Sequence, residues 1–340
     1  MQLALKNPFV TSLRRVEFID DIVLELHTDE NLVGFGAAAP TVAITGDSKE
    51  SILNSIENII IPIILNKKLD SSLLDDVQNC CDKNSSAKAC VDIALHDLLA
   101  REAKKPLYEY LGGTHKILET CITISLGAID EMVEHSKEAF ANGFEQLKIK
   151  LGDDLKHSID VVQKIHKALP DAKLLLDANQ AWNLSEAKKI MQTLKGVPIL
   201  LIEQPLTKGD INGMAELKKL DIFPILADES VFNFLDAKNI ISHNGCDMIN
   251  IKLMKCGGLK EAKKIIDVAK RSNIFCMVGS MLENPISVAA AAHLALSSGM
   301  IKFLDLDAPI LASHNPIDNA LHYDKNMIFL TRNSGLGILN

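Results

Sequence analysis

Two patterns of apolar positions divide the chain. After residue 119, short apolar runs alternate with stretches in which apolar residues recur at helical spacing. The eight runs cover residues 121–126, 146–151, 173–177, 199–203, 223–228, 248–253, 274–279 and 301–306. This alternation predicts an α/β fold, a modified (β/α)7β barrel of the TIM type. An open doubly wound sheet is the alternative, although the early Gly-x-Gly-x-x-Gly loop that such sheets often carry is missing.

The N-terminal part has a different pattern. Extended segments at 15–18, 22–26 and 32–36 predict antiparallel strands, and helical periodicity follows over 48–111. Strands and helices in separate blocks are typical of a small α+β domain. No barrel-type helix clearly follows the eighth run, and the last residues are punctuated by Pro and Asn. The predicted division is an α+β domain over 1–117, a barrel over 118–314, and a returning segment over 315–340 that completes the first domain.

Composition narrows the class of protein. The net charge of −8 argues against a nucleic-acid binder, which needs a basic surface. The longest small apolar stretch, 288–296, contains His293 and is far shorter than the roughly 20 residues that span a bilayer. Seven cysteines without a Cys-x-x-Cys pair fit a reducing compartment, so we expect a cytoplasmic protein.

Charged residues follow the predicted strands at regular intervals. From Lys150 the steps to Asp177, Glu203, Asp228 and Lys252 are 27, 26, 25 and 24 residues, one βα unit each. Buried parallel strands are normally apolar throughout. A single charge of this kind would suggest a solvated strand end, but a series in register predicts an active site at the C-terminal mouth of the barrel.

The three acidic members predict a metal site. Asp177, Glu203 and Asp228 offer only oxygen, which favours a hard divalent cation, Mg²⁺ first and Mn²⁺ second, with one ion per subunit. Asn179 and Glu229 are in supporting positions beside these ligands. The alternative is a carboxylate–lysine network that only closes the barrel mouth.

Three lysines flank the acidic cluster. Lys148 and Lys150 precede it on one strand face, and Lys252 follows it, so Lys150 and Lys252 approach from opposite sides of a closed barrel. We expect a nearby cation and partial desolvation to lower the lysine pKa toward that of a usable base. Two bases astride a metal-held carboxylate suit epimerisation through a metal-stabilised enediolate, with a neighbouring ammonium helping to hold it. One-sided use of the same set would give elimination.

The motifs in combination resemble the enolase superfamily in its muconate-lactonising subgroup. They are Lys148-Ile149-Lys150, Asp177-Ala178-Asn179, Ile202-Glu203-Gln204-Pro205, Ala227-Asp228-Glu229-Ser230 and Ile251-Lys252, together with Ala94-Leu95-His96-Asp97-Leu98 in the first domain. The resemblance covers essentially the whole chain and implies that the N-terminal domain caps the barrel. Within the subgroup the sequence is most similar to the dipeptide epimerases of the L-Ala-D/L-Glu type.

This similarity implies substrate contacts. Asp305 and Asp307 match the Asp-x-Asp pair that receives the α-ammonium of the dipeptide, and two carboxylates on one strand face suit a group with three donors. The segment 8–14 resembles a mobile capping loop, with Arg14 placed to meet a glutamate side chain and Arg15 as the alternative. The remaining expected pocket residues are Ile44 in a second loop over 40–47, Thr123, Ser280, Met281 and Glu283.

The implied function is a Mg²⁺-dependent isomerase that interconverts L-Ala-D-Glu and L-Ala-L-Glu from murein peptides. An o-succinylbenzoate synthase or a muconate cycloisomerase is the alternative within the subgroup, but their substrates carry no ammonium for Asp305 and Asp307. An N-acylamino acid racemase is disfavoured for the same reason. A catalytically silent binding protein would be expected to have lost a ligand or a lysine, and none is missing. The expected partners are the dipeptide and further copies of the chain, without nucleic acid or membrane.

Overall fold

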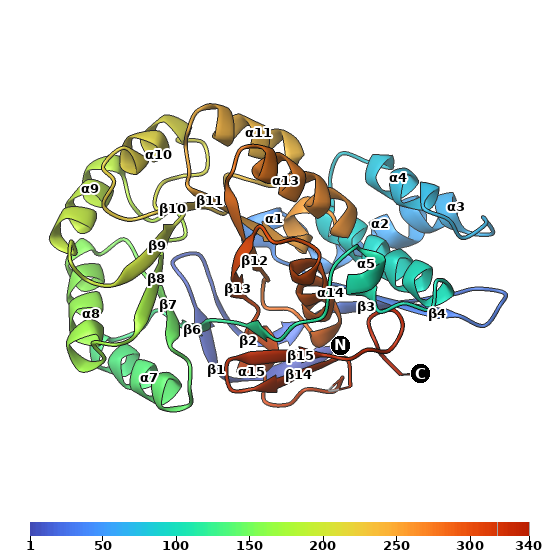
Figure 1. Cartoon of the computed structure of the whole chain (residues 1–340), viewed down its shortest axis with the longest axis horizontal. Helices are drawn as coiled ribbons and strands as arrows, with labels where there is room; N and C mark the ends of the chain where they lie inside the picture. Colours follow the sequence, from blue (N-terminus) through green and yellow to red (C-terminus); the bar gives the residue numbers. More distant parts are fainter. Residues whose placement is uncertain (318, 340) are drawn as a thin grey trace.

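A barrel and a smaller N-terminal part make up the molecule (Figure 1). The structure is a computed structural model and describes residues 1–317 and 319–339. Residues 318 and 340 of the predicted returning segment lie outside the described residues. No helix in the described ranges is both long and apolar enough to cross a membrane.

The barrel contains eight parallel strands in sequential order, which confirms the predicted fold class. They are β6 (Ile122–Ile124), β7 (Gln146–Lys150), β8 (Lys173–Asp177), β9 (Ile199–Glu203), β10 (Ile225–Ala227), β11 (Met248–Lys252), β12 (Phe275–Gly279) and β13 (Ile301–Asp305). A layer of apolar side chains, including Cys121, Leu175 and Met277, fills the barrel interior below the strand ends. The mouth is therefore the polar end of a packed core.

Seven main helices connect and cover the strands: α7 (Ile129–Ala141), α8 (Leu155–Ala168), α9 (Leu184–Thr193), α10 (Ile211–Lys218), α11 (Phe234–Ser242), α13 (Leu259–Arg271) and α14 (Pro285–Leu296). Side-chain caps begin several of them. Asn183 and Glu186 form a capping box at α9, and Asn233 accepts two amide hydrogens at α11. Two short helices, α12 (Leu253–Cys256) and α15 (Ala308–Leu311), follow β11 and β13.

The N-terminal part contains two antiparallel strand pairs, β1 (Gln2–Val10) with β2 (Arg15–Asp20) and β3 (Ile22–His27) with β4 (Val33–Ala38). The helical segments are α1 (Val42–Thr45), α2 (Lys49–Ser55), the π-helix η1 (Ile56–Ile60), α3 (Ile61–Ile64), α4 (Ser72–Asn79), α5 (Ser85–Glu102) and α6 (Leu107–Tyr110). Helix α5 packs on β4 so closely that a Cβ atom at Gly34 or Gly36 would collide with carbonyl oxygens of α5. Two glycines thus allow the sheet to pack directly against the helix.

Strand β1 was not expected from the sequence. It extends to Val10, so the predicted loop over 8–14 is reduced to a turn over 11–14 between β1 and β2. Most side chains of β1 are exposed, and for this reason its apolar pattern gave no strand signal. The hairpin reaches the barrel mouth (Figure 1), where the amide of Leu126 donates to the carbonyl of Val10 at 3.0 Å.

The C-terminal segment leaves the barrel. Strands β14 (Leu321–Asp324) and β15 (Met327–Leu330) form a hairpin, and β15 also pairs with β5 (Leu118–Glu119), which precedes the first barrel strand. The chain then reaches the N-terminal part, where the carboxylate of Asp97 in α5 accepts the amide hydrogen of Leu336 at 2.7 Å. The division at residues 117 and 314 stays a proposal.

Candidate active site

Charged residues at the strand ends lie in one layer. Lys150, Asp177 and Glu203 are register partners across β7, β8 and β9. On the other side of the barrel, Lys252 is in register with Gly279, which is in register with Asp305. The intervals of one βα unit in the sequence therefore place these side chains at a common level in the barrel.

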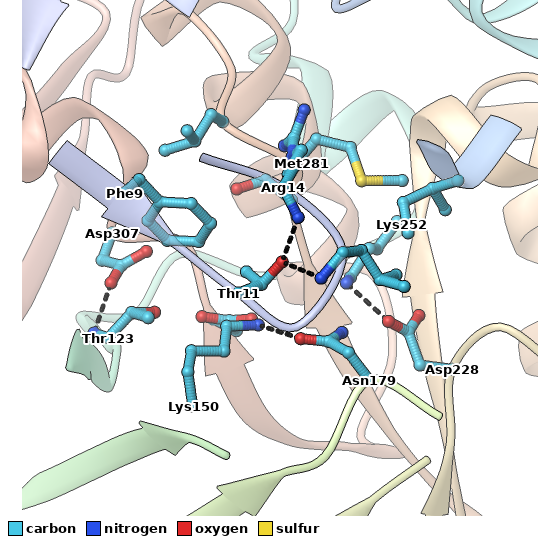
Figure 2. A pocket seen from close by; sticks show the side chains of 15 residues that line it. Phe9, Thr11, Arg14, Thr123, Lys150, Asn179, Asp228, Lys252, Met281 and Asp307 are labelled. Atoms are coloured by element: carbon cyan, nitrogen blue, oxygen red, sulfur yellow. Dashed lines mark hydrogen bonds and ion pairs between the residues drawn. The ribbon is translucent and has the colours of Figure 1, made fainter. Parts of the chain in front are cut away.

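A cavity opens above this layer (Figure 2). The barrel contributes Thr123, Lys150, Asn179, Asp228, Lys252, Ser280, Met281, Leu282, Asp305 and Asp307, and the N-terminal part contributes Phe9, Thr11, Leu13, Arg14 and Ile44. Residues from both ends of the chain thus enclose one space. The cavity is the candidate active site.

Lys150 and Lys252 reach this cavity from opposite sides, because β7 and β11 are four strands apart in a sheet of eight. The Lys150 ammonium donates to Asp177 at 2.6 Å and to the side-chain oxygen of Asn179 at 3.3 Å. The Lys252 ammonium donates to Asp228 at 2.6 Å. Figure 2 shows Lys150 beside Asn179 and Lys252 beside Asp228.

Lys148 lies in the floor of the site and is buried. Its Nζ atom is 2.6 Å from Asp305, 2.7 Å from Glu203 and 3.0 Å from Asp177. It does not line the cavity. This ammonium therefore bridges Asp177 and Glu203 of the acidic trio to Asp305 of the acidic pair, and it lies beneath the cavity.

Nearby carboxylates determine the direction of the pKa shift for two of the lysines. Burial lowers the pKa of Lys148, but contact with Asp305, Glu203 and Asp177 outweighs it and raises the pKa well above its usual value. Burial likewise lowers the pKa of Lys252, but the nearby carboxylate of Asp228 outweighs burial, so the pKa lies above its usual value. The sequence reasoning considered a neighbouring cation but not direct pairing with carboxylates.

Burial has different consequences for the carboxyl groups. It raises the pKa of Glu203 to about 7, reinforced by Asp177. Burial also opposes ionisation of Asp177, but the ammonium groups of Lys150 and Lys148 lower its pKa to about 2. Burial and then Asp305 raise the pKa of Asp307 to about 6. Neighbouring acids therefore differ in pKa because they differ in their contacts with ammonium groups.

The acidic trio fits a hard divalent cation. All its donors are oxygens, and Oε2 of Glu203 is buried without a well-oriented hydrogen bond, although the Lys148 ammonium lies 2.7 Å away. In the described part of the chain, no three His, Cys, Asp or Glu side chains converge closely enough to enclose a metal. Ammonium groups lie between the carboxylates instead. The residues that would hold Mg²⁺ are Asp177, Glu203 and Asp228.

Asn179 and Glu229 lie beside the acidic trio. The side-chain amide of Asn179 donates to Glu229 at 3.2 Å, and its backbone amide donates to Asp177 at 2.9 Å. Asn179 also adopts the left-handed conformation, with φ of 43°. The two residues predicted to support the ligands, Asn179 and Glu229, therefore contact each other beside the site.

Three supporting residues were missed. Lys255 in α12 donates to Asp228 at 2.5 Å, the side-chain amide of Asn250 donates to Glu203 at 2.9 Å, and the side-chain oxygen of Gln204 accepts the amide of Asp228 at 3.0 Å. Gln204 directly follows Glu203, and Asn250 shares a strand face with Lys252, so both carried a positional signal. Lys255 had none, because it belongs to a turn of helix that follows the strand.

The turn over residues 11–14 places Arg14 in the cavity. The hydroxyl of Thr11 accepts the amide hydrogens of Leu13 and Arg14, at 3.1 and 3.2 Å. Burial lowers the pKa of Arg14, and Asp21 partly opposes this. Among the described residues, its guanidinium forms no ion pair. Arg15 is exposed and lies 3.4 Å from Glu17, so the two arginines have different environments.

Glu283 lies elsewhere than expected. It was predicted to contact the substrate, but it is buried outside the cavity lining and accepts the amide hydrogen of Met281 at 2.7 Å. Burial raises its pKa. The alternation of a strand does not continue through the loop after β12, so the chain turns this side chain inward while Ser280 and Met281 face the cavity.

Together, the barrel, the layer of lysines and carboxylates, and the cover from the N-terminal part define a barrel enzyme equipped for proton transfer beside a divalent cation. Residues 2–112 match the model of the mandelate racemase/muconate lactonizing enzyme N-terminal domain, and residues 131–339 match the enolase C-terminal domain-like model. The chain belongs to the mandelate racemase/muconate lactonizing enzyme family of the enolase superfamily, which confirms the resemblance seen in the sequence.

Named relatives share the whole architecture. The L-amino acid-D/L-Glu epimerase of Sulfurimonas denitrificans is 44% identical over 92% of this chain and 92% of its own length. A substrate-liganded complex of the L-Ala-D/L-Glu epimerase from Bacillus subtilis superposes with a TM-score of 0.98 at 38% identity, over 100% of this chain and 96% of that one. The dipeptide epimerase from Enterococcus faecalis, complexed with Mg and L-Leu-L-Tyr, superposes with a TM-score of 0.93 at 34% identity. This match covers 100% of this chain and 97% of that one.

Proposed function

We propose that this protein is a Mg²⁺-dependent dipeptide epimerase that inverts the α-carbon of the C-terminal residue, with L-Ala-D/L-Glu as its preferred substrate. The observation that carries the proposal is the placement of Lys150 and Lys252 on opposite strands around one cavity. Inversion needs a base on each face of the α-carbon, and this pair supplies both.

The two lysines exchange roles with the direction of the reaction. One removes the α-proton from its face of the substrate, and the other donates a proton to the opposite face. Lys148 stays protonated between its three carboxylates and places a fixed positive charge under the cavity. When bound by the acidic trio, Mg²⁺ supplies further positive charge toward the substrate carboxylate.

Asp305 and Asp307 distinguish a dipeptide from other acids. Both line the cavity beside the barrel seam, where they would accept hydrogen bonds from a primary ammonium. The substrates of o-succinylbenzoate synthase and muconate cycloisomerase have no such group, so they would gain no charge-assisted hydrogen bond from this acidic pair. This acidic pair favours a dipeptide over those substrates.

Arg14 is our candidate for selecting the side chain that is epimerised. Its guanidinium lacks an ion-pair partner among the described residues, and it borders the same cavity as Met281 and Ile44. A glutamate side chain would provide the missing carboxylate. The murein origin of the peptide, a cytoplasmic location and a homo-oligomeric state belong to the same proposal and are supported by the family resemblance and the cysteine pattern alone.

Proton NMR in D₂O tests the function directly. With Mg²⁺ present, L-Ala-D-Glu and L-Ala-L-Glu should each lose the α-proton signal of the glutamate residue and converge on one mixture of epimers. A small dipeptide library measured in the same way gives the preference at the second position. Retention of the α-proton in every dipeptide would contradict the proposal, and elimination products would favour the alternative chemistry.

A further inference from the structure

The seam that closes the barrel differs from the other strand junctions. Neighbouring strands from β6 to β13 are joined by backbone pairing. Between the first and last strands, the amide of Cys121 donates to the carbonyl of Leu304 at 3.0 Å, but the next links use side chains. The amide of Leu306 donates to Oγ1 of Thr120 at 2.9 Å, and the amide of Thr123 donates to the carboxylate of Asp307 at 2.6 Å. Figure 2 shows this last bond at the edge of the cavity.

The carbonyl of Leu306 is held as well. It accepts a hydrogen bond from the hydroxyl of Tyr323 at 2.6 Å. Burial, followed by the charge of Asp307, raises the pKa of Tyr323 well above its usual value, so the hydroxyl remains a donor at neutral pH. Both backbone groups of the residue between Asp305 and Asp307 are therefore bound by side chains from outside the strand.

Tyr323 and Thr120 are linked through one small sheet. Tyr323 is in β14, which pairs with β15, and β15 pairs with β5, the strand that leads into Thr120. The amide of Thr120 also donates to the carbonyl of Asn326, in the turn between β14 and β15, at 2.9 Å. The C-terminal hairpin thus carries one residue that contacts Leu306 and is hydrogen-bonded to the other. In Figure 1 this hairpin lies below β6 and β13.

We propose that Tyr323 and Thr120 are positioning residues that fix the backbone of Leu306 and so set the spacing of Asp305 and Asp307 for the substrate ammonium. The inference rests on the proposed function, which assigns the ammonium to this acidic pair. The N–H of Leu306 belongs to the peptide unit that follows Asp305, and its C=O belongs to the peptide unit that precedes Asp307. Neither peptide unit can rotate without breaking a hydrogen bond, and such a rotation would turn the flanking carboxylates away from the cavity. The returning segment would thereby contribute to substrate recognition.

The test compares two ligands that differ only in the ammonium. Tyr323→Phe should raise KM for L-Ala-D-Glu about threefold to tenfold, as expected for loss of one hydrogen bond that positions the pair. The inhibition constant of N-propionyl-D-glutamate, which lacks the ammonium, should change less than twofold. Tyr110→Phe is the matched control, because Tyr110 lies in α6 away from the seam. It should leave both constants unchanged.

A second pair of variants covers the other contact. Thr120→Val should also raise the ratio of KM for L-Ala-D-Glu to the inhibition constant of N-propionyl-D-glutamate. Thr120→Ser, which keeps the hydroxyl, should restore this ratio. A ratio that stays constant in both Tyr323→Phe and Thr120→Val, or equal weakening of both ligands, would overturn the inference while leaving the epimerase intact. Failure of the unaltered protein to exchange the α-proton would instead overturn the proposed function, and the inference with it.

Discussion

Lys150 and Asp177 are register partners on β7 and β8, and the ammonium of the first lies 2.6 Å from the carboxylate of the second. A proposed base is thus paired with a proposed metal ligand. The same holds for Lys252 and Asp228, again at 2.6 Å. Any cation held by the acidic trio competes with both lysines for these carboxylates. The ion pairing of the two lysines and the binding of the cation are therefore coupled.

Removal of divalent cations should abolish turnover. A bound metal contributes several kcal/mol to stabilising developing charge, so treatment with EDTA should lower kcat/KM about a thousandfold or more. Added Mg²⁺ should restore it, and a titration gives the half-saturating concentration. Mg²⁺ should also raise the Tm, since it binds only the folded state. Full activity after exhaustive chelation would contradict the metal assignment.

Lys255→Met should weaken this metal site. Lys255 donates to Asp228 from behind, and loss of such a supporting contact typically costs 10-fold to 100-fold in metal affinity, so the half-saturating Mg²⁺ concentration should rise by about that factor. Lys264→Met is the control, because Lys264 is half-exposed and pairs with Glu261 on α13. Equal Mg²⁺ requirements in the two variants would show that Lys255 does not position the ligand.

Replacing either proposed base should separate the two half-reactions. Lys150→Ala and Lys252→Ala should each lower the epimerisation rate at least about a hundredfold to ten-thousandfold, the usual contribution of a general base. Each variant should still exchange the α-proton of one epimer with D₂O, and the two variants should differ in which epimer exchanges. NMR of each pure epimer measures this.

Lys156→Ala, an exposed change on α8, should behave like the unaltered protein. Equal and complete exchange of both epimers in either base variant would overturn the assignment of one lysine to each face.

The barrel and the order of its charges could be predicted because each βα unit repeats one rule. A buried strand that ends in a charged residue stands out from its apolar neighbours, so Asp177, Glu203 and Lys252 were visible in the sequence. Residues that reach the site from irregular segments were not. Lys255 projects from a turn of helix, and Tyr323 approaches from a hairpin that is distant in sequence.

Two further differences have physical causes. Glu283 looked like a pocket residue because it follows the seventh strand, but the loop there turns it inward onto the amide of Met281. Direct pairing with carboxylates raises the pKa of Lys148 and Lys252, and the spacing of charges in the sequence did not reveal these pairs. Sequence spacing gives the level of a side chain in the barrel but not its nearest partner.

Arg14→Met should alter specificity more than catalysis. The guanidinium lacks an ion-pair partner among the described residues, so losing its contact with a glutamate side chain should raise KM for L-Ala-D-Glu about tenfold to a hundredfold. KM for Ala-Ala should change little, because that dipeptide has no second carboxylate. Arg15→Met is the matched control, since Arg15 is exposed and pairs with Glu17. An unchanged KM ratio in Arg14→Met, or a shift in Arg15→Met instead, would assign the role elsewhere.

His293 should make the fold less stable in mild acid. It is buried in α14, where its Nδ1 atom accepts the amide hydrogen of Tyr108 at 3.0 Å and its ring stacks on that of Tyr108. Burial lowers its pKa from 6.5 to about 3. Between these values the unfolded chain binds a proton that the folded protein excludes, so stability falls as the pH decreases from about 6.5 toward 3 and is unaffected above that window.

His293→Gln removes this titration. The variant is expected to be less stable at pH 7, because the ring packing is lost, but its further loss of stability between pH 7 and pH 5 should be smaller than that of the unaltered protein by about 2 kcal/mol. Urea unfolding at the two pH values measures the difference, and titration of other groups cancels in the comparison. His27→Gln, at a side chain that is 64% exposed, should decline as the unaltered protein does. If His293→Gln declines equally, the cost of protonating this histidine is not what limits stability in mild acid.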